Sequence, residues 1–133
     1  MGHSIRKHRS VAVVVEQDQE QRAMAVVLLE ETELDVIECG TAEDALKTMD
    51  NAMAADRIAL AFVNMRLPGR MDGVEFAQVV KRQRPDVQVI VTSRKPGRRI
   101  EALPEGAVHM AKPWLPLDLL IHAERARADR LSR

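Results

Sequence analysis

The sequence predicts a three-layer α/β/α sandwich in which helices cover both faces of a parallel sheet. Five short apolar runs, which suit strands, alternate along the chain with stretches that have the apolar spacing of helices. The first and third runs are apolar at nearly every position, which is typical of strands buried on both faces. No internal repeat or linker divides the chain, and 133 residues fit one domain with its own core.

The predicted strands differ in how strongly the sequence supports them. The second run alternates between apolar and polar residues and therefore suits an edge strand, and the fifth run is a weak strand. In chain order the predicted strands cover residues 11–15, 34–38, 58–63, 87–92 and 107–111.

Start and stop signals mark the predicted helices. The first helix covers residues 18–31, and Thr41 followed by Asp44 has the form of a capping box at the start of the second. A third helix starts at Asp72 and ends before Pro85, a fourth within 97–104 is short, and Pro116 suits the first turn of the last. The apolar residues expected on the four longer helices are Met24, Val27, Leu28, Leu46, Met49, Met53, Phe76, Val79, Val80, Leu117, Leu120 and Ile121.

Composition excludes several classes of function. The chain has 20 basic and 20 acidic residues, so no net charge attracts it to nucleic acid. No apolar stretch approaches the ~20 residues of a membrane-spanning helix or forms a signal-peptide core. The single cysteine, Cys39, suits a reducing cytoplasm. We expect a flexible basic tail over residues 1–10 and a single cytoplasmic domain over residues 11–133, with no nucleic-acid or membrane partner.

Polar residues follow four of the predicted strands. Glu16 and Gln17 come after the first strand, Asn64 after the third, Thr92 at the end of the fourth, and Lys112 after the fifth. Right-handed crossovers bring the carboxyl ends of parallel strands to one edge of the sheet, where ligands bind in α/β folds. The sequence therefore predicts a functional site at this edge.

Three segments at these strand ends resemble a known family. They cover residues 64–73 (NMRLPGRMDG), 89–93 (VIVTS) and 112–114 (KPW). Their order and spacing resemble the receiver domain of bacterial two-component response regulators, over residues 11–126. The resemblance implies a flavodoxin-like (βα)5 fold with strand order 2-1-3-4-5.

The resemblance also implies a phosphorylation site from which this sequence departs. The family carries a phosphoacceptor aspartate where this chain has Asn64, and an acidic pair that holds Mg²⁺ where it has Glu16 and Gln17. An amide has no anionic oxygen to attack phosphorus, and Mg²⁺ prefers carboxylate oxygens. We therefore expect no phosphorylation, no cofactor and weak or absent Mg²⁺ binding. Read without the family, Asn64 is also compatible with a simple turn former.

The remaining family positions match better. Thr92 corresponds to the hydroxyl that binds a phosphoryl oxygen, His109 to the side chain that rotates between two states, and Lys112 to the lysine that pairs with the acidic cluster. A cis peptide bond is expected before Pro113. The residues alone leave other readings open, namely a strand threonine, a structural histidine, and a lysine that is either solvated or paired with Glu16.

These observations predict an atypical receiver domain that acts through protein–protein contacts and is not an enzyme. A histidine kinase is one candidate partner, and a homodimer through residues 97–130 is another. One alternative is a conventional receiver that carries an Asp-to-Asn change, against which the second departure at Gln17 argues. The other is a small α/β ligand-binding protein or enzyme, although no glycine-rich phosphate loop or Ser-His-Asp arrangement is evident.

A basic run lies beside the predicted site. It comprises Arg94, Lys95, Arg98 and Arg99. Such runs are usually solvated loops, and a minority bind phosphate or an acidic partner.

Overall fold

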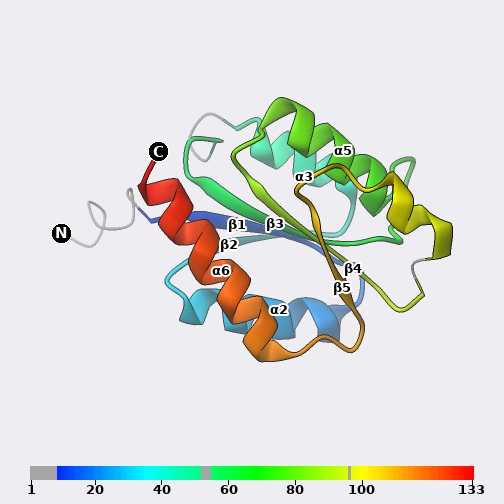
Figure 1. Cartoon of the computed structure of the whole chain (residues 1–133), viewed down its shortest axis with the longest axis horizontal. Coiled ribbons are helices and arrows are strands. Elements are labelled where there is room, and N and C mark those ends of the chain that lie inside the picture. The colour runs from blue at the N-terminus through cyan, green and yellow to red at the C-terminus, as the bar shows by residue number, and fades with distance from the viewer. Residues whose placement is uncertain (1–8, 52–54, 96) are drawn as a thin grey trace.

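The computed structural model describes residues 9–51, 55–95 and 97–133, which form a five-stranded parallel sheet with helices on both faces (Figure 1). The strand order is β2-β1-β3-β4-β5, so the predicted fold class and strand order are confirmed. The strands are β1 (Val11–Val15), β2 (Asp35–Cys39), β3 (Ile58–Asn64), β4 (Gln88–Ser93) and β5 (Val108–Ala111). The helices are α2 (Gln19–Glu31), α3 (Ala42–Met49), α5 (Gly73–Gln83), the 3₁₀ helix η1 (Gly97–Ala102) and α6 (Pro116–Leu131).

Side-chain capping sets the start of three helices. The carboxylate of Asp18 accepts hydrogen bonds from the first turn of α2, and the hydroxyl of Thr41 does the same for α3. Asp72 and Glu75 form a complete capping box at α5. Helix α6 lacks a side-chain cap and begins instead with Pro116, which has no N–H to satisfy.

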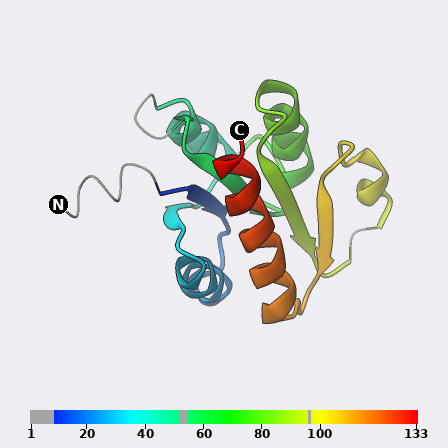
Figure 2. The same cartoon turned by 60° about the vertical axis from the view of Figure 1, so that its left-hand side comes forward.

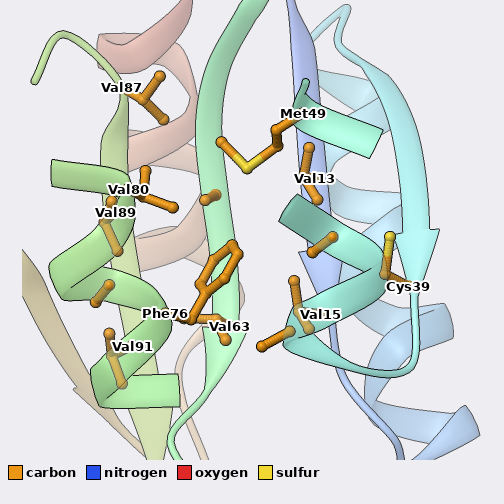
Figure 3. Close-up of a cluster of buried hydrophobic side chains, with 14 of the residues drawn as sticks. Val13, Val15, Cys39, Met49, Val63, Phe76, Val80, Val87, Val89 and Val91 are labelled. Atoms are coloured by element: carbon orange, nitrogen blue, oxygen red, sulfur yellow. The ribbon is translucent and has the colours of Figure 1, made fainter. Parts of the chain in front are cut away.

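Two apolar clusters lie on opposite faces of the sheet. Helices α3 and α5 cover one face, and α2 and α6 cover the other (Figures 1 and 2). On the first face Val63 lies beside Phe76 of α5, and Val13 lies beside Met49 of α3 (Figure 3). On the second face the rings of Phe62 and Trp114 meet edge to face, with their centroids 5.6 Å apart.

Most of the apolar residues predicted to be buried on helices α2 and α6 are exposed, although Leu28 is partly buried against the apolar cluster beneath them. Met24 and Val27 of α2 are 46% and 57% exposed, and Leu117 and Ile121 of α6 are 65% and 42% exposed. The two helices lie close together over the sheet, which leaves room mainly for small side chains between them. Each buried face therefore carries a single leucine flanked by alanine. The buried residues of the two helices are Ala25, Leu29, Leu119, Ala123 and Ala126. Alanine carries little apolar signal, so the spacing of larger side chains indicated the wrong face.

The amino-terminal edge of the domain begins before β1. Arg9 lies 3.1 Å from the carboxylate of Asp35, its carbonyl accepts a hydrogen bond from Arg57, and Ser10 is buried. Most of the predicted tail, residues 1–8, lies outside the described residues, as does Met53. Within the described parts of the chain, no helix has the length and apolar character needed to cross a membrane.

Candidate functional site

The polar residues at the strand ends share one face of the sheet. Phe62 and Ile90 belong to the cluster under α2 and α6, and side chains alternate along a strand, so Asn64 and Thr92 lie on that same face. The two residues are also paired in register between β3 and β4. The same alternation places Glu16 and Lys112, which follow β1 and β5, on this face.

Glu16 is the centre of a buried polar network. Its Oε1 accepts a hydrogen bond from Lys112 Nζ at 2.9 Å, and its Oε2 accepts one from Asn64 Nδ2 at 3.0 Å. The backbone N–H of Asp18 also donates to Oε2, at 3.2 Å. Glu16 is 1% exposed, so a buried carboxylate is balanced by one cation and satisfied by two further donors. The sequence raised the Glu16–Lys112 ion pair as one of two readings, and it is present.

The other residues after β1 contribute little negative charge to the network. Gln17 is exposed, and the carboxylate of Asp18 accepts hydrogen bonds from the backbone N–H groups of Glu20 and Gln21 at 2.9 and 3.2 Å. Asp18 is therefore a helix cap, as its position at the start of the helix suggested.

This donor set does not fit Mg²⁺. Both oxygens of Glu16 already accept hydrogen bonds, and Mg²⁺ requires several free oxygen ligands in near-octahedral geometry. Over the described ranges no group of three or more His, Cys, Asp or Glu side chains is arranged to hold a metal ion. Lys112 occupies the position beside the carboxylate where a cation would bind.

The end of β4 carries two hydroxyls that point to opposite faces. Thr92 is fully buried, and its Oγ1 has no hydrogen-bond partner among the described residues. Ser93 Oγ lies 2.7 Å from His109 Nε2 on the other face of the sheet. This pair was not predicted from the sequence, although the register between β4 and β5 makes Ser93 and His109 diagonal neighbours.

The loop between β3 and α5 is held by backbone contacts. The Met65 N–H donates to the Thr92 carbonyl at 2.7 Å, and the Gly73 N–H donates to the Met65 carbonyl at 2.8 Å. A Cβ at Gly73 would lie 2.1 Å from the carbonyl oxygen of Asn64, so only glycine allows α5 to start so close to the end of β3.

Glu43 of α3 is a second anchor for this loop. Its Oε1 accepts hydrogen bonds from the N–H groups of Arg70 and Met71 at 3.0 and 2.8 Å. Gly69 adopts a φ of 96° beside this carboxylate, a conformation that favours glycine. Local sequence does not indicate this contact, because Glu43 lies 27 residues before Arg70.

The turn after β5 brings Lys112 to the site. Its backbone N–H donates to the Ser93 carbonyl at 2.8 Å, which extends the pairing of β4 and β5 by one bond. The peptide bond between Lys112 and Pro113 is cis, as the sequence analysis expected.

Comparison with known proteins decides the family. The family described as response regulator receiver domain matches residues 12–124. The chain belongs to this family. As a receiver domain it is a signalling module of two-component systems. No curated protein matches the chain at a significant level.

Solved structures similar to this receiver domain share its fold. The signal receiver domain of an HD domain-containing protein from Pseudomonas fluorescens Pf-5 superposes with a TM-score of 0.80 at 19% identity, covering 94% of this chain and 99% of that one. A response regulator receiver domain protein from Clostridium thermocellum gives 0.78 at 20% identity, with 92% and 98% covered. NtrX from Brucella abortus gives 0.75 at 24% identity, covering 94% of this chain but 28% of NtrX.

A pocket of about 670 Å³ opens above the buried network of this receiver domain. Of the basic run predicted beside the site, Arg94 and Lys95 line the pocket, whereas Arg98 and Arg99 lie on η1. Arg99 pairs with Asp72 at 2.5 Å, which holds η1 near the start of α5. Arg66 also lines the pocket, from the loop after β3, and was not predicted as a site residue. Its position two residues after Asn64 could have indicated that it lies at the site.

Proposed function

We propose that this receiver domain acts without aspartyl phosphorylation, as a protein-interaction module of a signalling pathway. The observation that carries the proposal is the hydrogen bond from Asn64 Nδ2 to Glu16 Oε2 at 3.0 Å. An amide that donates into the neighbouring carboxylate occupies the position that the family resemblance assigns to the phosphoacceptor.

The chemistry of the amide supports this function. The nitrogen lone pair of Asn64 is delocalised, and its oxygen carries no formal charge with which to attack phosphorus. Lys112 neutralises Glu16 at 2.9 Å, so the metal that would offset charge on a phosphoryl group has no suitable ligand set here.

The hydrogen bond between Asn64 and Glu16 supports the view that the amide is native to this site, and not an Asp-to-Asn change in a conventional receiver domain. An aspartate in the same conformation would place two carboxylates about as close as the present hydrogen bond, which raises their mutual repulsion. An amide supplies the donor that the buried Glu16 requires, and Gln17 is a second neutral side chain at the same edge.

The proposed contact surface comprises η1, β5 and α6. Ile100 of η1 and Leu117 of α6 expose 39% and 65% of their surface, and Leu115, the N-cap residue of α6, exposes 64%. A protein partner covers this surface in the proposal, with a histidine kinase and a second copy of the chain as candidates. Because Asn64 gains no charge by phosphorylation in this proposal, a conformational change must draw its free energy from the differential binding of a partner or ligand.

Sedimentation velocity of the chain tests the second-copy candidate for this surface. Reversing the charge of the exposed Arg125 should weaken association, whereas Arg127 is already occupied by Glu124 at 2.8 Å and is a less direct reporter. Unchanged sedimentation would remove the homodimer through residues 97–130 from the proposal.

Phosphorylation is tested by intact-mass spectrometry after incubation with acetyl phosphate and Mg²⁺. We expect the wild type to gain no phosphoryl group. The double variant Asn64→Asp with Gln17→Asp is the positive control, since it restores two carboxylates and should bind Mg²⁺ and accept phosphate better than Asn64→Asp alone. A stoichiometric mass gain on wild-type residue 64, in peptides that still contain Asn, would overturn the proposal.

A further inference from the structure

The pocket above Asn64 carries an excess of positive charge. Among the described residues, its lining contains four cationic side chains, Arg66, Arg94, Lys95 and Lys112, but only two acidic ones. Lys112 is paired with the buried Glu16, and Asp18 is the remaining acid, whose carboxylate caps α2. The mouth of the pocket therefore presents three cations against one carboxylate, the reverse of a site that binds a divalent metal ion.

The three cations at the mouth have no acidic partner in the part of the chain that the structure describes. Arg66, Arg94 and Lys95 are exposed, and none of them forms an ion pair with a described residue. Several arginines elsewhere do form ion pairs, as Arg22 does with Glu38 at 3.2 Å and Arg57 with Asp35 at 2.8 Å. Like charges gathered around one hollow repel each other, and a bound anion relieves this repulsion.

Neutral donors complete the pocket. The Asn64 amide nitrogen carries two hydrogens and gives one to Glu16, which leaves a second that can be donated. The amide of Gln17 also lines the pocket and is exposed. Amide and guanidinium donors around a cationic hollow suit an anion with several acceptor oxygens.

We propose that this pocket binds a phosphate dianion without a metal ion, either as free phosphate or as the terminal phosphate of a small ester. The excess of two positive charges matches the charge of a phosphate monoester near neutral pH. A volume of about 670 Å³ exceeds the need of phosphate alone and lies in the range of small-molecule sites. The proposal rests on the proposed function, because the pocket is available to a free anion only if residue 64 is not itself phosphorylated.

The experiment is an amide-resolved NMR titration of the whole chain with a chelator present. Inorganic phosphate and glycerol 3-phosphate are the two probes, and sodium chloride at equal ionic strength is the control. We expect saturable shifts at Gln17, Asn64, Arg66, Arg94 and Lys95, including the Asn64 side-chain amide, and no saturable shift with chloride. Tighter binding of the ester identifies a small ester as the better ligand, and equal binding identifies phosphate itself.

Matched variants separate this site from general surface attraction. The double variant Arg94→Gln, Lys95→Gln should weaken phosphate binding about fivefold or more, because each substitution removes one partly solvated cation that would contact the anion. Arg82→Gln removes an exposed cation in the last turn of α5, outside the pocket lining, and should leave the affinity unchanged.

Each outcome decides a separate claim. Three results would overturn the phosphate pocket and leave the proposed function intact. They are an absence of saturable shifts, shifts confined to other residues, or a loss of phosphate affinity in Arg82→Gln as large as that in the Arg94→Gln, Lys95→Gln variant. Intact mass is measured on the same samples after incubation with acetyl phosphate and Mg²⁺. A phosphoryl group on residue 64 would overturn the proposed function instead.

Discussion

Replacing Asn64 with aspartate should destabilise the folded protein in a pH-dependent way. The substitution removes the amide donor that lies 3.0 Å from Glu16 Oε2 and puts a second carboxylate beside a buried one. Losing a hydrogen bond to a charged group costs about 1.5–3 kcal/mol. Two unit charges about 3 Å apart repel by about 5 kcal/mol at an effective dielectric constant of about 20, before Lys112 reduces the repulsion.

Protonation limits the size of this effect. The variant can keep one proton on the carboxyl pair, and a protonated Asp would donate to Glu16 as the amide does. Holding that proton at about pH 7 on a group that normally releases it near pH 4 costs about 4 kcal/mol. We therefore expect Asn64→Asp to lower the free energy of unfolding by about 2–4 kcal/mol at about pH 7 and by less than about 1 kcal/mol near pH 4.5.

The sign of the pH dependence follows from linkage. The folded pair retains a proton that the unfolded chain releases, so the folded variant loses stability relative to wild type as the pH rises from about 4 to 7. The assay is urea unfolding followed by the fluorescence of Trp114, the single tryptophan, with a chelator present. Gln83→Glu, which adds a carboxylate at the exposed end of α5, is the control and should change stability by less than about 0.5 kcal/mol. If Asn64→Asp is as stable as wild type, or if its loss of stability does not vary with pH, the Asn64 amide does not stabilise the buried Glu16 carboxylate.

Three further perturbations test other contacts by the same unfolding assay. Gly73→Ala should destabilise the protein by about 2 kcal/mol or more, because the new Cβ would lie 2.1 Å from a backbone atom. Gly40→Ala should be tolerated, because no atom lies within 4 Å of its Cβ. A larger loss for Gly40→Ala than for Gly73→Ala would show that α5 does not approach β3 so closely. Lys112→Met should cost about 3 kcal/mol at neutral pH by leaving the buried Glu16 unpaired, and a neutral result would mean that solvent already compensates this charge. Burial raises the pKa of the Cys39 thiol above its ordinary 9.0, so the unfolded chain loses that proton first and stability should fall as the pH rises above 9.0. The stability of Cys39→Ala should fall less steeply with pH than that of wild type. Identical slopes for the two proteins would contradict a raised pKa for the Cys39 thiol.

Much of the fold could be predicted from local sequence. Strands buried on both faces appear as short β-branched runs, and the caps at Asp18, Thr41 and Asp72 mark helix starts within a residue. The burial of α2 and α6 could not be predicted in this way. Their inner faces carry alanines, and the close approach of the two helices, which exists only after the chain folds, decides which face is buried.

The candidate site, too, could be predicted only in part from local sequence. Strand-end positions brought Glu16, Asn64 and Lys112 to one network, because parallel strands place their carboxyl ends together. The partner of Ser93 depends on the register between β4 and β5, and the anchor at Glu43 depends on how α3 faces a distant loop. Neither the register nor the facing of a helix is encoded within a few residues of the contact.

Signalling without phosphorylation of residue 64 is best tested by the amide NMR spectrum of the desalted wild-type protein before and after treatment with acetyl phosphate and Mg²⁺. Desalting removes any anion held in the pocket without a covalent bond. We expect superimposable spectra, because Asn64 cannot carry a phosphoryl group and its hydrogen bond to Glu16 is retained. New resonances for Asn64, Thr92, His109 and Lys112 that persist after desalting would contradict it.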